Sequence, residues 1–399
     1  MRSLPACLVA LISAAEAQVG LNADLYTTYT DNVFLTASQR GDLMQSAYID
    51  FSYQFDADLS LYYSGNANVF SENADLFNHL HSFGASYARP LGAAGLFFAG
   101  TTLSLRLDRP LYNYRDFAAG RAFASFEPYL HPELITRLDY TLSYQNFLNA
   151  ASYNYLEQHL DAQLTHYLPT RTTLQLNGEL GLKSYLRETT QPSRNPLLWG
   201  TRLKAAQSLG PNLGLQLAWH HQGILAGQSR HADWLWHDPN RLFDDPYKTE
   251  VEWYDPDELY KTKAKSKAYW YKTKATSQAY WYDPDELFED RYSYSGDQWS
   301  ATLKYLARLN CELAASFYRE SRLYSERPAY DLAGVLTGES TTETRHTARL
   351  GLARAFYLDN TPFQEMALEL EWLYRSVASN DAFYSADAHA YSVGVQFGF

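Results

Sequence analysis

The sequence predicts an all-β fold: a transmembrane antiparallel up-and-down β-barrel of sixteen strands with one long extracellular loop insertion. Three observations lead to this fold class. Apolar and polar residues alternate through most of the chain, which is typical of strands with two unlike faces. Many alternating segments run past ten residues, longer than the five or six of an ordinary globular strand. Short and long connectors alternate between these segments, as in a barrel inserted from the periplasm.

Residues 1–17 have the composition of a secretory signal peptide. Arg2 supplies a basic start, an apolar stretch follows, and the small-residue triplet "AEA" ends at Ala17. We expect cleavage after Ala17, so that residues 18–399 form the barrel. Of the two cysteines, only Cys311 lies in this mature part, which excludes an intramolecular disulfide framework.

The alternation is clearest in the segment "LITRLDYTLSYQ". Its residues Leu138 and Tyr140 point to one face of a strand, whereas Arg137 and Asp139 point to the other. Sixteen segments of this kind are predicted near residues 19–29, 45–55, 57–70, 78–89, 95–108, 119–130, 134–147, 155–168, 172–186, 198–209, 213–225, 292–307, 310–323, 343–358, 363–375 and 386–399.

The bulk composition supports one membrane-embedded domain rather than several soluble ones. No shift in composition marks a linker, and beyond the signal peptide no run of 18 apolar residues could form a membrane helix. Aromatic residues make up 16% of the chain, with 33 tyrosines. The net charge of −12 argues against a nucleic-acid partner.

The connectors after even-numbered strands are short and rich in turn residues, from Asp56 alone to "PLGAA" and "DNTP". Those after odd-numbered strands are longer, for example "SENADLF", "RPLYNYRDFA" and "YSERPAYDLAGVLTGESTTE". A soluble sandwich has no reason to place every long loop at one end. A barrel with short periplasmic turns and long extracellular loops does.

The final strand, "YSVGVQFGF", has one face of aromatic and branched residues and one face of small or polar residues. Lipid cannot satisfy an open sheet edge, so this strand must pair with the first one. Its Gly394, Phe397 and Phe399 resemble the C-terminal signal of Gram-negative outer-membrane β-barrels. The resemblance covers the whole mature chain at the level of architecture. It implies the bacterial outer membrane with both termini periplasmic, outer-membrane lipids around the barrel, and recognition by the barrel-assembly machinery.

Sixteen strands enclose an aqueous channel unless a plug fills it, and the predicted inward faces carry charges that could pair across neighbouring strands. We interpret them as a charge ladder that sets ion preference, or simply as the hydrophilic wall that any water-filled barrel needs. The pore-lining candidates are Arg137, Asp139, Glu157, Asp161, Glu179, Lys183, Arg202, Lys204, Lys304, Glu312, Arg349, Glu365, Glu369 and Glu371. General porins narrow the pore with an inward-folded third loop. Here the third long connector, "RPLYNYRDFA", is short and lacks that signature.

The connector over residues 226–291 contains a duplication. "WYDPDEL" occurs twice, and "YKTKAKSKAYWY" is followed by "YKTKATSQAYWY", for which a protruding hairpin is one interpretation. Aromatic side chains beside charges could bind a surface glycan or a partner protein. The alternative is an expanded surface loop without a ligand. The candidate binding residues are Trp253, Tyr254, Trp270, Trp281 and Tyr282. The acidic "DPDEL" stretches are a weak match to a divalent-cation site because the further ligands of such motifs are missing.

The first functional hypothesis is passive or selective passage of small hydrophilic solutes through a porin-like channel. The alternative is a barrel-anchored surface binding or scaffold protein that uses residues 226–291. Polymer export is a third reading, but the first strand leaves no room for the periplasmic helical repeats such exporters carry. We predict no enzyme, since His220 and His221 near the outer rim have no spacing that ties them to a nucleophile. We also predict no cofactor and no resident metal.

Overall fold

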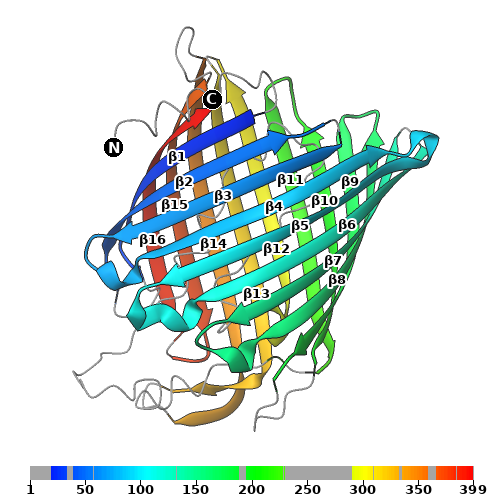
Figure 1. Ribbon diagram of the computed structural model, residues 1–399. Helices are drawn as coiled ribbons and strands as arrows, with labels where there is room; N and C mark the ends of the chain where they lie inside the picture. The colour runs from blue at the N-terminus through cyan, green and yellow to red at the C-terminus, as the bar shows by residue number, and fades with distance from the viewer. Residues whose placement is uncertain are drawn as a thin grey trace, which may run out of the picture.

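The computed structural model describes residues 19–33, 39–56, 58–131, 133–187, 195–227, 229, 290–308, 310–331, 335–357, 365–382 and 384–398. Within these ranges, sixteen strands form one closed antiparallel barrel (Figure 1). The strands are β1 (Val19–Thr30), β2 (Asp42–Gln54), β3 (Leu59–Phe70), β4 (Asn78–Pro90), β5 (Gly95–Asp108), β6 (Phe117–His131), β7 (Leu134–Phe147), β8 (Tyr155–Leu168), β9 (Thr172–Tyr185), β10 (Leu197–Ser208), β11 (Leu213–Ala226), β12 (Ser295–Ala307), β13 (Cys311–Tyr330), β14 (Leu336–Tyr357), β15 (Glu365–Ser379) and β16 (Ala386–Gly398). The short 3₁₀ turns are η1 (Ala74–Leu76), η2 (Gly92–Ala94), η3 (Pro110–Arg115), η4 (Ala151–Tyr153) and η7 (Arg291–Ser293).

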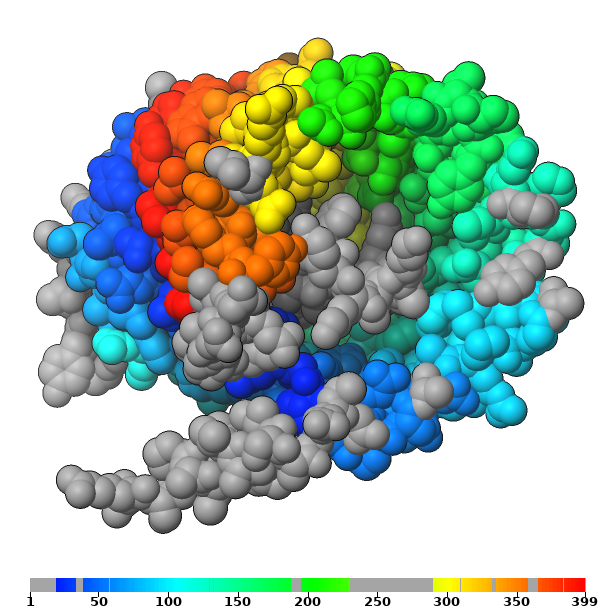
Figure 2. All heavy atoms as spheres, turned by 90° about the horizontal axis from the view of Figure 1, so that it is seen from above, coloured from blue at the N-terminus to red at the C-terminus, as the bar shows by residue number. Residues whose placement is uncertain are grey.

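The barrel closes between its first and last strands. β1 pairs with β16 from Asn22 opposite Gly398 to Thr30 opposite Ala390, so neither strand leaves an open edge along this stretch. Seen end-on in Figure 2, the wall passes through the whole colour sequence and brings blue strands beside red ones. The predicted closure and strand count are therefore confirmed. The signal-peptide prediction concerns residues outside the described ranges.

The two faces of the wall differ as the alternation predicts. In β7, Leu138 and Tyr140 are exposed on the outside, whereas Thr141 and Gln145 are buried against the inner wall. The outer face carries many exposed apolar side chains, which suits hydrocarbon, and polar side chains such as Thr141 turn inward. Among the described residues, no helix is long and apolar enough to cross a membrane.

Small apolar clusters lie where the long connectors leave the strands, at the lower end of the barrel in Figure 1. One combines Val33, Met44, Phe70 and Leu76, and another combines aromatic residues of β6 to β8 with η4. η1, η3, η4 and η7 each follow an odd-numbered strand, whereas η2 belongs to a short connector at the other end. The predicted alternation of connector lengths holds as far as β13, but the connectors after β13 (331–335) and after β15 (380–385) have fewer residues than the connector after β14 (358–364).

The hairpin of β13 and β14 corrects one prediction. The stretch "YSERPAYDLAGVLTGESTTE" (324–343) was expected to be a loop, but β13 continues to Tyr330 and β14 begins at Leu336. Proline and glycine in this stretch mark an irregular ladder rather than a break, since the register shifts between Tyr324 and Pro328. In Figure 1 the end of this hairpin bends across the lower end of the barrel.

Candidate functional site: the lumen wall

The inner wall is the candidate site because it gathers the charged side chains that lipid would exclude. The cross-strand pairing expected between β7 and β8 is wrong in detail. Asp139 lies opposite Asp161, and Asp161 lies opposite Glu179, so three acids form a row across β7, β8 and β9. Arg137 instead pairs with Asp139 of its own strand, at 2.9 Å between Nε and Oδ1.

Two other predicted pairs do form between neighbouring strands. The Lys304 Nζ lies 3.0 Å from Oε1 of Glu312, between β12 and β13 near the short-connector end. Arg349 of β14 forms an ion pair with Glu371 of β15, and both side chains are partly exposed to the lumen. These pairs hold long side chains against the wall.

Glu179 is the centre of a cluster that sequence reasoning only partly found. His159 and His220 place Nε2 atoms 3.0 and 3.2 Å from the Glu179 carboxylate oxygens. His220 was predicted at the outer rim, but its side chain lies inside the lumen. Its neighbour His221 points outward instead, with Nδ1 3.0 Å from Oδ1 of Asp297. Period two explains the difference, because adjacent residues of a strand face opposite sides.

The turn that leads into β12 enters this cluster. The Arg291 guanidinium lies 2.6 Å from Oε1 of Glu157 and 3.7 Å from Oε2 of Glu179. Tyr292 donates a hydrogen bond from its hydroxyl to the same Glu157 oxygen, at 2.8 Å. In this register Glu157 lies opposite Lys183, so the wall beneath the turn presents both signs of charge.

A second contact joins the first residue of this turn to the barrel wall. The Lys183 Nζ lies 2.6 Å from Oδ2 of Asp290, and both side chains are almost completely buried. The same ammonium group stands 3.9 Å from the centre of the Tyr155 ring, a cation–π geometry. Ser229, at the other end of the long connector, donates a hydrogen bond to Asp290 and contacts the Tyr185 hydroxyl. The two ends of the connector therefore meet on the wall.

The charge state of the turn is fixed by these neighbours. Burial alone would lower the pKa of Arg291, but the carboxylates of Glu157 and Glu179 hold it well above its ordinary value. Burial, followed by the Glu157 charge, raises the pKa of Tyr292, so its hydroxyl remains a proton donor. Sequence reasoning missed Asp290, Arg291 and Tyr292 as lumen residues. An acid–base pair directly before a strand was the only local signal for them.

The remaining predicted residues divide between two sides of the lumen. On one side, the inner faces of β1, β2 and β15 carry Asp24, Asp50 and Glu369. Tyr26 donates to Glu369 at 3.3 Å, and Oδ2 of Asp24 is buried with no hydrogen-bond partner among the residues that the structure describes. On the other side, Arg202 and Lys204 of β10 form no ion pair with any described residue. Glu365 lies at the short-connector end of β15.

The assembly residues lie at the seam of the barrel. Gly394 is opposite both Tyr26 of β1 and Glu369 of β15, and its lack of a Cβ makes space for the Tyr26 ring. Phe397 is opposite Ala23. Phe399 lies outside the described residues. So do the binding candidates of the long connector: Trp253, Tyr254, Trp270, Trp281 and Tyr282.

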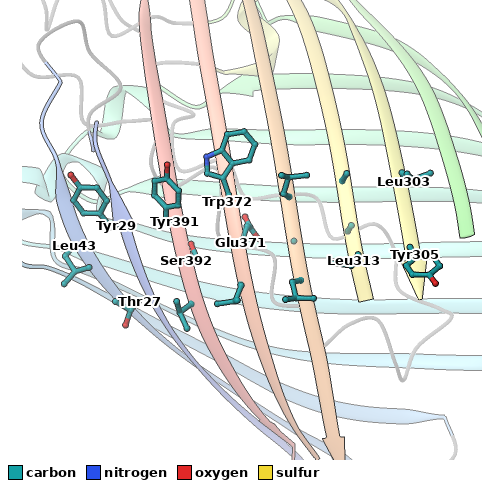
Figure 3. Close-up of a pocket in the computed structure, with 17 residues that line it drawn as sticks. Thr27, Tyr29, Leu43, Leu303, Tyr305, Leu313, Glu371, Trp372, Tyr391 and Ser392 are labelled. Atoms are coloured by element: carbon teal, nitrogen blue, oxygen red, sulfur yellow. The ribbon is translucent and has the colours of Figure 1, made fainter. Parts of the chain in front are cut away.

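A hollow with a volume of about 830 Å³ lies on the outer face and not in the lumen. Figure 3 shows Tyr29, Tyr391 and Trp372 along its edge, and these three residues lie opposite one another on β1, β16 and β15. Its lining is apolar, as expected of a surface in contact with lipid and its aromatic belt. Among the described residues, no group of three or more His, Cys, Asp or Glu side chains is arranged to hold a metal ion.

Comparisons with known proteins assign the chain to no family. No protein-family model and no curated protein matches the chain. The similar solved structures include OpdL of Pseudomonas aeruginosa, with 11% identity, a TM-score of 0.47, and coverage of 96% of this chain and 99% of that one. OpdK of the same organism has 10% identity, a TM-score of 0.48 and coverage of 96% and 98%. CdiB of Acinetobacter baumannii has 11% identity, a TM-score of 0.49 and coverage of 94% and 60%. At such TM-scores these likenesses add nothing to what the strand pairing itself shows.

Proposed function

We propose that this barrel is a porin-like channel of the bacterial outer membrane for the passive or selective passage of small hydrophilic solutes, with its termini in the periplasm. The observation that carries the proposal is the contrast between the two faces of one closed wall. Exposed Leu, Tyr and Val side chains cover the outside, while charged residues line the inside. A barrel of sixteen strands is wide enough for water and small solutes to pass through its lumen.

Planar-bilayer recording of the purified protein tests this proposal. We expect stepwise conductance from protein whose folded form still migrates differently from its heat-denatured form on a gel. Folded protein that inserts into the bilayer without passing current would refute the channel. Liposome swelling with uncharged solutes of increasing size would then give the exclusion limit.

Binding at the cell surface by the long connector is the second candidate function. It is supported by the contact that joins the two ends of the connector on the barrel wall. Because Ser229 and Asp290 are hydrogen-bonded to each other, residues 230–289 can be replaced by a short glycine linker without removing the anchors. We expect this deletion to leave the barrel folded and to abolish any adhesion of whole cells to glycan or protein surfaces. Unchanged adhesion would exclude the connector as the receptor.

A further inference from the structure

The Asp290–Ser293 turn reaches well inside the barrel. Arg291 contacts Glu157, two residues from the start of β8 at Tyr155, and also reaches Glu179, six residues from the end of β9 at Tyr185. At a rise of about 3.3 Å per residue, these partners lie roughly 7 and 20 Å along their strands from the long-connector end. The side chain therefore stands beside the row of acids formed by Glu179, Asp161 and their neighbour on β7, and not at the mouth of the barrel.

The turn is also fixed rather than loosely packed. The buried Lys183–Asp290 ion pair holds its first residue, and Tyr292 is almost completely buried against the wall. Glu157 accepts hydrogen bonds from both Arg291 and Tyr292. Removing one partner of a buried pair leaves an uncompensated charge, so the bound position of this turn is strongly favoured.

We propose that this turn is the constriction of the channel and that Arg291 is its selectivity-determining residue. This inference rests on the proposed channel function. The wall on this side carries four carboxylates, Asp139, Glu157, Asp161 and Glu179, and Arg291 supplies a permanent positive charge among them. Without it, the balance of charge beside these carboxylates becomes more negative, which favours cations over anions.

The test compares two arginines that have the same charge and similar exposure but lie at different positions in the lumen. Arg291 and Arg349 are each paired with a glutamate, and their side chains are 26% and 29% exposed. We expect Arg291→Gln to raise the ratio of potassium to chloride permeability about threefold or more, since a unit charge is removed within a few ångströms of the permeant ion. Arg349→Gln should change the ratio much less.

The reversal potential in a potassium chloride gradient measures this ratio. Arg291→Lys, which keeps the charge, should restore a value near that of the wild type. Equal shifts from Arg291→Gln and Arg349→Gln would overturn the constriction while leaving the channel intact. A wild-type protein that does not conduct would instead overturn the proposed function itself.

A second pair of variants covers the case in which Arg291→Gln does not fold. Glu179→Gln removes a carboxylate from the same place, whereas Glu371→Gln removes the partner of Arg349. Glu179→Gln should shift the ratio toward chloride, and Glu371→Gln should shift it less. Matching effects of these two variants would also overturn the proposal. Migration of the unheated protein on a gel confirms that each variant is folded before it is recorded.

Discussion

At the scale of single residues, glycines on the inner wall provide space for aromatic rings from other strands. A Cβ on Gly394 would collide with the Tyr26 ring, which donates to Glu369 and accepts from Gln396 at 2.7 Å. Gly351, also within a strand, has no atom within 4 Å of the same position. We expect Gly394→Ala to lower stability by about 1–3 kcal/mol, as overpacking usually does.

The control for this prediction is Gly351→Ala. It should leave the stability of the barrel unchanged or raise it by up to about 1 kcal/mol, because alanine lowers the conformational entropy of the unfolded chain. The measurement is the temperature at which the folded band disappears from a gel. If both variants lose the folded band at the same temperature, the packing of the Tyr26 ring does not require the missing Cβ of Gly394. A seam weakened at Gly394 should also slow assembly, since β16 is the strand that closes the barrel.

At the scale of elements, the extended hairpin of β13 and β14 depends on one buried carboxylate. Glu343 is completely buried and forms ion pairs with both Arg327 and Arg345. Arg327 also lies over the Tyr384 ring of the next long connector, 4.3 Å from its centre. The hairpin end thus packs on its neighbour, and the backbone of Ala382 donates to Tyr330 across the same contact.

Glu343→Gln should release this end of the hairpin, because it removes the carboxylate that pairs with both buried guanidinium groups. The expected local loss is about 3–5 kcal/mol, the usual cost of breaking a buried ion pair. Hydrogen exchange of residues 324–343 in detergent should become much faster, while exchange elsewhere in the barrel is unchanged. Glu339→Gln, on the exposed part of β14, is the control and should leave the exchange rates as they are. Protection that survives in Glu343→Gln would contradict this role.

The same hairpin shows what the sequence could and could not predict. The strand bounds follow from alternation because lipid demands an apolar outer face at every second residue, and most lie within a few residues of the structure. The continuation of β13 past Pro328 was not predictable, since side-chain bonds such as that from Thr341 to the Pro328 carbonyl replace missing ladder bonds. The position of Arg291 was not predictable either, because its partners Glu157 and Glu179 are more than a hundred residues away in the chain.

At the scale of the whole molecule, the ring places the basic residues Arg202 and Lys204 across the lumen from the acidic residues Asp24 and Asp50. β2 and β10 lie eight strands apart in a ring of sixteen, so they face each other. Asp24 and Asp50 lie on β1 and β2, and Arg202 and Lys204 lie on β10, next to the strand that carries Glu179. Solutes that carry both charges can align between these walls, whereas neutral solutes of the same size cannot.

A zwitterionic amino acid such as serine should therefore enter proteoliposomes faster than an uncharged polyol of similar size. The double variant Arg202→Gln with Lys204→Gln should reduce this advantage about twofold or more at low ionic strength, since salt screens the walls from each other. The matched control is Lys304→Gln, which removes a paired cation near the short-connector end and should leave the ratio of swelling rates unchanged. If the double variant also keeps the wild-type ratio, the separation of charge across the lumen does not select solutes, and pore width alone determines what passes.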